Sequence, residues 1–271
     1  MMENLLPSRR KFLKATGLGA LLTGIVNQGV FGGSGTKVKS EDATKDLEKI
    51  ATLLNAKDKP AIWLFTGDSI THGAKHTKGY RSYPEVFGER IRWEMQRMRD
   101  VVINTGISGN TTANILDDFE WRVSQFRPAV VSLMLGTNDC IRKGITLEVF
   151  EKNLDMIITK IRASGAIPIL HTPNIVIPEK APDRGATLPL YVPVIRKVAG
   201  NRNAILVDNY QHWEDTMKND TSVNVYRQWL NDPLHPGEKG HQEIARLLFK
   251  KLSIFDPKEP TCGGAYYEGE H

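Results

Sequence analysis

Short, continuously apolar runs alternate with longer amphipathic segments along most of this 271-residue chain. Continuous apolar runs of this length predict strands that are buried on both faces, whereas half-exposed strands alternate polar and apolar residues. Helix-length segments separate the runs, and this alternation predicts a parallel sheet covered by helices on both faces. We therefore expect an α/β fold with a flavodoxin-like, doubly wound sheet of about five strands. The expected strands are 61–65, 101–103, 129–135, 167–170 and 204–207.

The expected helices rest on apolar side chains at helical spacing. In the segment 146–163, Phe150, Leu154 and Ile158 fall on one face, and Gly165 follows as a typical helix-ending residue. The full set of expected helices is 40–56, 81–98, 114–123, 146–163, 188–199 and 240–252.

The first 40 residues differ in charge from the rest of the chain. They contain six basic side chains against the single acidic Glu3, and so account for the whole net charge of +5. A protein that binds nucleic acid keeps its basic patch in the folded domain, so no nucleic-acid partner is expected. Arg9 and Arg10 precede a moderately apolar run, 15–31, and this pattern resembles a twin-arginine export signal. The alternatives are an unstructured basic terminus and a short membrane anchor.

These features predict three parts of the chain. Residues 1–39 form the export signal and a linker, 40–255 form one domain, and 256–271 form a tail that is loose or packed on the surface. The signal predicts recognition by the twin-arginine machinery, export to the periplasm or beyond, and membrane contact through the signal alone. Cys140 and Cys262 lie far apart in the sequence, and we expect two unrelated thiols.

Polar blocks follow the predicted strands at the points where each strand ends. In a doubly wound sheet, functional groups gather outside the carboxyl ends of the strands, so these blocks should meet at one edge. Four blocks stand out: Gly67-Asp68-Ser69-Ile70-Thr71, the segment 104–112, Gly136-Thr137-Asn138-Asp139, and Asp232-Pro233-Leu234-His235-Pro236.

The residue types in these blocks suit ester hydrolysis by a serine. Such a reaction needs a hydroxyl nucleophile, a base, a group that orients the base, and donors for the developing oxyanion. Ser69 is the candidate nucleophile and His235 the candidate base, and Asp232 is three residues away and so near enough to fix the imidazole tautomer. The candidate donors are the backbone amides of Ser69 and Gly109 and the side-chain amide of Asn138, and Gly109 has no side chain to hinder close approach.

Four blocks in this order resemble the SGNH (GDSL-like) hydrolase family, whose block residues correspond here to Ser69, Gly109, Asn138 and His235. The resemblance extends over residues 63–242. It implies a three-layer α/β/α sandwich with five parallel strands and hydrolysis of esters or thioesters without a metal or cofactor. The Gly-x-Ser-x-Gly pattern of α/β-hydrolases is absent around Ser69.

Other polar residues near these blocks are open to a second interpretation. Asp68 and Asp139 are expected to stabilise their loops. His72 and His76 have the spacing of metal ligands on a helix, but nearby glycines favour a loop and no third ligand is evident. His171 ends the fourth strand, where it either packs in the core or lines the site.

The substrate is the least determined feature. Export, together with few large apolar side chains in 174–187, favours removal of acetyl groups from carbohydrate over a long acyl tunnel. Trp229 could stack on a sugar ring, or it could simply pack in the core. The alternatives are a lipase, lysophospholipase or thioesterase for longer chains, and a non-catalytic relative that binds glycans.

Overall fold

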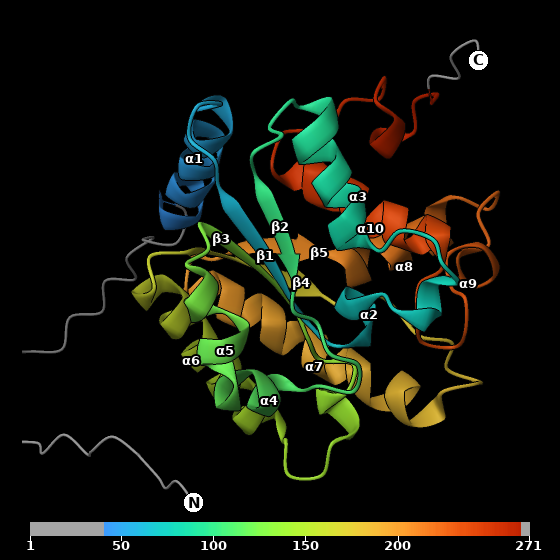
Figure 1. Ribbon diagram of the computed structural model, residues 1–271. Coiled ribbons are helices and arrows are strands. Elements are labelled where there is room, and N and C mark those ends of the chain that lie inside the picture. Colours follow the sequence, from blue (N-terminus) through green and yellow to red (C-terminus); the bar gives the residue numbers. More distant parts are fainter. Residues whose placement is uncertain (1–40, 267–271) are drawn as a thin grey trace, which may run out of the picture. The chain divides into compact units, whose positions relative to one another are not determined.

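The computed structural model describes residues 41–266 and contains a five-stranded, all-parallel sheet in the order β2-β1-β3-β4-β5 (Figure 1). The strand order reverses at β1, so β1 and β3 are the neighbours at which a crevice is expected at the carboxyl edge. The predicted fold class and all five predicted strands are confirmed. The strands are β1 Ile62–Gly67, β2 Val101–Asn104, β3 Val130–Met134, β4 Ile167–Thr172 and β5 Ile205–Asp208.

Helices cover both faces of the sheet, and a separate hydrophobic cluster lies under each layer (Figure 1). Alternate residues of β1 point to opposite clusters: Trp63 and Phe65 pack under α1, α3, α8 and α10, and Leu64 packs under α4 to α7. The helices are α1 Glu41–Asn55, α2 Ser69–His72, α3 Tyr83–Glu89, α4 Thr112–Asp117, α5 Phe119–Arg122, α6 Leu147–Ala163, α7 Pro182–Asn201, α8 Asn209–Asn219, α9 Val225–Gln228 and α10 Glu238–Lys251.

The helix predicted at 81–98 is shorter than expected. It begins at Tyr83, because Glu85 Oε2 accepts from both the backbone N–H (2.7 Å) and the hydroxyl (2.6 Å) of Ser82 in a capping box. After Glu89 it widens into one π-helical turn, Arg90–Glu94, and Gln96 at φ +56° ends it.

Two other predicted helices have the wrong bounds, and the longest of the helices that were not predicted is α8. The helix expected at 114–123 is divided into α4 and α5. The helix expected at 188–199 begins six residues earlier at Pro182, since a proline fits the first turn, where its missing N–H is not needed. α8 is largely polar and buries Asn209 and Trp213, so it lacks the apolar spacing that predicts a helix.

Part of the segment expected to be a tail packs against the domain. The Thr261 N–H donates to Glu94 Oε1 at 2.9 Å, and Cys262 belongs to the core cluster under α3 and α10. Cys262 and Cys140 are both free and buried. Within residues 41–266 no helix combines the length and hydropathy needed to cross a membrane. The expected export signal lies outside the described residues.

Candidate active site

Ser69 lies where β1 ends and α2 begins, at the carboxyl edge of the sheet (Figure 1). Asp68 caps α2 by accepting the Ile70 N–H at 2.9 Å. Gly67 precedes this turn, and a Cβ there would fall 2.3 Å from the Met134 carbonyl oxygen. Only glycine therefore lets β1 pass β3 closely enough to place Ser69 at the crevice.

The side chains of Ser69, His235 and Asp232 form a hydrogen-bonded relay, although Ser69 and His235 are 166 positions apart. Ser69 Oγ lies 2.8 Å from His235 Nε2, and His235 Nδ1 lies 2.8 Å and 3.0 Å from the two carboxylate oxygens of Asp232. A proton on Nδ1 satisfies the carboxylate and leaves the Nε2 lone pair free to accept the serine proton. The structure thus brings together the three residues predicted to act as nucleophile, base and orienting acid.

A single turn holds Asp232 against His235. Asp232 Oδ1 accepts the backbone N–H groups of Leu234 and His235, each at 2.8 Å. Partial burial raises the pKa of Asp232, but these two hydrogen bonds and the His235 ring outweigh it, so the pKa lies below its usual value. Asp232 is therefore ionised at neutral pH and can stabilise an imidazolium at His235.

The loops of Gly109 and Asn138 are joined to each other. Asn138 Nδ2 donates to the Asn110 carbonyl at 3.1 Å, and the Gly109 carbonyl accepts from Arg142 at 3.3 Å. Gly109 adopts φ +83°, a left-handed conformation that favours glycine. Apart from its two chain neighbours, no atom of residues 41–266 lies within 4 Å of a Cβ built there, so the backbone conformation and not crowding accounts for this glycine.

Two arginines support the loops that carry Gly109 and Asn138, and sequence reasoning missed both of them. Arg184, in the first turn of α7, donates to the Thr137 carbonyl at 2.9 Å and to Asn138 Oδ1 at 3.2 Å, and so fixes which way the Asn138 amide points. Arg122 is buried and donates to the carbonyls of Gly67 (3.2 Å) and Thr105 (2.7 Å) and to the Asn110 side chain. Neither contact has a local sequence signal, because both join distant segments.

Asp68 and Asp139, which adjoin Ser69 and Asn138 in the sequence, lie in different environments. Asp139 accepts from the backbone and hydroxyl of Thr112 (2.8 and 2.7 Å) and from the Gly136 N–H (3.2 Å), which is a loop-stabilising arrangement. Asp68 is fully buried, and this burial raises its pKa to about 7.

The remaining histidines lie outside the relay. His171 is buried and lies 2.9 Å from the Ser132 hydroxyl, and burial lowers its pKa to about 3. His241 Nδ1, buried in α10, accepts the Tyr83 N–H at 3.2 Å. His72 is exposed and contacts Ser108 (3.1 Å). His76 was considered as a metal ligand together with His72, but its ring stacks on His235 instead.

One group of metal-ligand residue types lies close together in the described part of the chain, namely His76, Asp232 and His235. A metal ion lies in the ring plane of each imidazole that binds it. The rings of His76 and His235 are nearly parallel, at 12°, with centroids 3.5 Å apart, so one ion cannot lie in both planes. The present side-chain arrangement therefore suits the serine relay and does not fit a shared metal ion.

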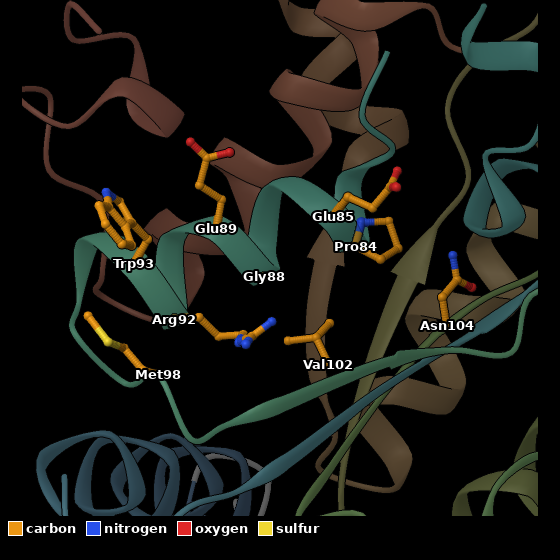
Figure 2. Close-up of a pocket in the computed structure, with 9 residues that line it drawn as sticks. All are labelled: Pro84, Glu85, Gly88, Glu89, Arg92, Trp93, Met98, Val102 and Asn104. Carbon is orange, nitrogen blue, oxygen red and sulfur yellow. The ribbon is translucent and has the colours of Figure 1, made fainter. Parts of the chain in front are cut away.

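A hollow of about 480 Å³ borders His235 and Asp232 on the side of α7. Its other walls include the charged side chains of Lys180, Asp183 and Arg184, so it is not a long apolar tunnel. A second hollow of about 580 Å³ lies between α3 and β2, with Trp93 at one end, and none of the relay residues lines it (Figure 2).

Trp229 is not available to stack on a sugar. Its side chain is 6% exposed and packs edge-on against Trp213, with ring centroids 5.1 Å apart. Of the two alternatives for Trp229, stacking on a sugar and packing in the core, the structure therefore shows core packing.

Comparison with known proteins identifies the family. The model of the GDSL-like lipase/acylhydrolase family matches residues 65–243, which include all four polar blocks. The chain belongs to this family. The resemblance to the SGNH (GDSL-like) hydrolases that the four blocks indicated is confirmed.

Two characterised relatives are esterases. An acetylxylan esterase of Geobacillus stearothermophilus is 26% identical over 208 residues, covering 70% of this chain and 93% of the relative. An arylesterase of Vibrio mimicus is 27% identical over 192 residues, covering 70% and 86%. An uncharacterized Mycoplasma pneumoniae protein shares 107 residues at 41% identity, and this stretch spans 38% of this chain but 12% of that protein.

A solved structure supports the fold. The α/β hydrolase LAE5, from a Lake Arreo metagenome, superposes with a TM-score of 0.62 at 23% identity, covering 72% of this chain and 96% of that one. Family membership and esterase relatives together make this GDSL-like protein a carboxylic ester hydrolase.

Proposed function

We propose that this protein is an exported serine esterase in which Ser69 is the nucleophile, His235 the general base and Asp232 the residue that orients the base. The observation that carries this proposal is the Ser69–His235–Asp232 relay, with both links at 2.8 Å. The intact relay also counts against a glycan-binding relative without activity.

In the proposed reaction, Ser69 Oγ attacks the ester carbonyl carbon while its proton passes to His235 Nε2. The resulting oxyanion accepts hydrogen bonds from the backbone amides of Ser69 and Gly109 and from the Asn138 side chain. His235 then gives its proton to the leaving alcohol, and an acyl-enzyme remains on Ser69. Water then attacks this acyl group while its proton passes to His235, and the acyl–Oγ bond breaks as His235 returns that proton to Ser69, which releases the acid.

The nucleophile is tested by Ser69→Ala. No neighbouring group can replace the attacking oxygen, so hydrolysis of p-nitrophenyl acetate should fall by on the order of 10⁴–10⁶ while the fold is retained. A fluorophosphonate probe should label Ser69 in the wild type and leave the variant unlabelled. Labelling of a different serine, or no turnover by the wild type, would refute the proposal.

For the substrate we propose short acyl groups, acetyl above all, carried by carbohydrate. Two observations support this choice. The hollow beside His235 is lined by Lys180, Asp183 and Arg184, which disfavour a long apolar chain, and one relative is an acetylxylan esterase. Lipase, lysophospholipase or thioesterase activity on longer chains is the alternative.

A series of p-nitrophenyl esters separates these two substrate classes. Each methylene that enters a fitting apolar pocket contributes about 0.8 kcal/mol, so a long-chain enzyme gains kcat/KM steadily from acetyl to octanoyl. We expect kcat/KM to fall beyond acetyl or propionyl, and we expect acetylated glycan to be deacetylated. A maximum at eight carbons or more would favour the long-chain alternative.

For location we propose export through the twin-arginine machinery to the periplasm or beyond. Support comes from Arg9, Arg10 and the apolar run after them, since a receptor reads such a signal as an address. Exchange of both arginines for lysine keeps the charge and should leave the precursor in the cytoplasm. Unchanged export of that double variant would contradict the proposal.

A further inference from the structure

His76 lies directly against the candidate base. It occupies a one-turn 3₁₀ helix, Lys75–Thr77, in the connection between α2 and α3. Its ring stacks on that of His235 with 3.5 Å between centroids and 12° between planes, and its side chain is only 17% exposed. This contact covers one whole face of the imidazole that must accept the Ser69 proton.

The backbone of His76 is tied to the loop of the candidate acid. The side-chain amide of Asn231, next to Asp232, donates to the His76 carbonyl at 2.6 Å. On the other side, the Thr77 N–H donates to the Gly73 carbonyl at 3.2 Å, one residue after α2 ends. The chain that follows Ser69 and α2 therefore returns to the relay at His235. Hydrogen bonds on both sides of His76, to Asn231 and to Gly73, hold the stacked ring in place.

His76 also faces the carboxylate that orients His235. Its Nδ1 lies 3.6 Å from Asp232 Oδ2, the oxygen that His235 Nδ1 approaches to 2.8 Å. Asp232 Oδ1 is already used by the Leu234 and His235 backbone N–H groups, whereas within residues 41–266 no backbone N–H donates to Oδ2. A carboxylate oxygen accepts more than one hydrogen bond, so a small closing movement lets His76 serve as its second side-chain donor.

The charges around His76 favour its neutral form. Burial and the neighbouring His235 lower the pKa of His76, and Lys75 adds to this effect, while Asp232 opposes it. His241 in α10 is close enough to interact with both stacked rings. A neutral His76 is required beside the base, because two stacked imidazolium rings would repel each other when His235 takes up the serine proton.

We propose that His76 is a positioning residue for the relay: its ring forms the wall that fixes the plane of His235, and its Nδ1–H is a second donor to Asp232. This inference rests on the proposed serine esterase function. In this arrangement His76 acts on the substrate only through His235 and Asp232. It aligns Nε2 with Ser69 Oγ before the substrate binds, so its removal affects kcat and leaves KM nearly unchanged.

Three substitutions separate the two contributions of the ring. His76→Ala removes both the wall and the donor, His76→Phe keeps a flat wall, and His76→Asn keeps a donor near the position of Nδ1. Small misplacements of a catalytic group cost up to about 100-fold in rate. We expect kcat to fall about 10- to 100-fold in the alanine variant and less in each of the other two. Lys78→Ala, an exposed site at the end of the same short helix, should stay within about twofold of the wild type.

A double-mutant cycle tests the route through Asp232. In an Asp232→Ala background, exchange of His76 for phenylalanine should have no further effect on kcat or on the rate at which fluorophosphonate labels Ser69. The same loss in both backgrounds would overturn the donor role, and a wild-type kcat in His76→Ala would overturn the whole inference. Activity that a chelator abolishes and Zn²⁺ restores would overturn it as well, because the cluster would then be a metal site.

These outcomes differ from failure of the proposed function. If the wild type neither turns over p-nitrophenyl acetate nor reacts with the fluorophosphonate, the serine esterase proposal fails and His76 has no relay to position. If the wild type is active and His76→Ala equals it, only the present inference fails. Circular dichroism and thermal melting of each variant exclude loss of the fold as the cause of a reduced kcat.

Discussion

The two sides of the candidate site are held in different ways. On the base side, Asp232 and His235 belong to one turn, and the backbone N–H groups of residues 234 and 235 fix the carboxylate. On the oxyanion side, Asn138 is oriented by Arg184 from α7, 46 positions further along the chain. Local geometry therefore holds the carboxylate of Asp232 against His235, whereas a long-range side-chain contact orients Asn138, the proposed side-chain donor to the oxyanion, and the two sides should respond differently to mutation.

The largest effect is expected on the base side, from Asp232→Asn. The amide keeps the size of the side chain but no longer stabilises the Nδ1–H tautomer of His235, so Nε2 cannot accept the serine proton. We expect kcat to fall about 10⁴-fold with an unchanged melting temperature, measured with p-nitrophenyl acetate. A loss below tenfold would show that the turn, and not the carboxylate charge, orients His235.

The features that could be predicted from the sequence also differ between the two sides of the site. The relay could be predicted because Asp232 and His235 are three residues apart and Ser69 directly follows a strand. Arg184 could not, because the expected helix began at residue 188 and left this arginine in a loop. The burial of Trp229 could not be decided from the sequence, because it depends on contacts with a helix that was not predicted. The Trp229 ring contacts His212 and Trp213, and both of these residues belong to α8.

The oxyanion side is tested next by Asn138→Ala. The Asn138 amide is expected to bond the transition-state oxyanion more strongly than the ground-state ester, so its loss lowers kcat more than it raises KM. We expect a decrease in kcat of about 10²–10³. A change confined to KM would assign Asn138 to substrate binding and would leave the Ser69 and Gly109 amides as the donors.

Arg184→Met asks whether the oxyanion side depends on distant contacts. Methionine fills similar space but cannot donate to Asn138 Oδ1, so the Asn110 carbonyl alone holds the amide and its orientation is less fixed. We expect kcat to fall about tenfold, which is the effect of a misdirected donor and not of a missing one. Lys180→Met, at another cation lining the same hollow, controls for the loss of charge and should change kcat less.

A double-mutant cycle between Arg184 and Asn138 tests whether the arginine acts through the amide. In an Asn138→Ala background, Arg184→Met should cost nothing further if the arginine acts through that amide. Equal losses in both backgrounds would show that Arg184 contacts the substrate directly, and the contrast between the two sides would then be weaker.

The last expected effect concerns stability and not catalysis, at the buried Asp68. Its pKa is raised from 3.8 to about 7 by burial, so the folded protein keeps the carboxyl protonated at pH values where the unfolded chain has released the proton. Stability from this group is complete below pH 4 and is lost as the pH rises to about 7. At about 1.4 kcal/mol for each tenfold change, the loss reaches about 4 kcal/mol at pH 8.

Asp68→Asn removes this dependence, because the amide is neutral at every pH and its oxygen can still accept the Ile70 N–H. The melting temperature of the variant relative to the wild type should therefore rise by at least about 5 °C between pH 4 and pH 8. Asp58→Asn, at an exposed site, serves as the control and should show no such trend. A difference that stays constant over this range would mean that Asp68 is ionised in the folded protein, with its second oxygen stabilised by water or by the loops on either side.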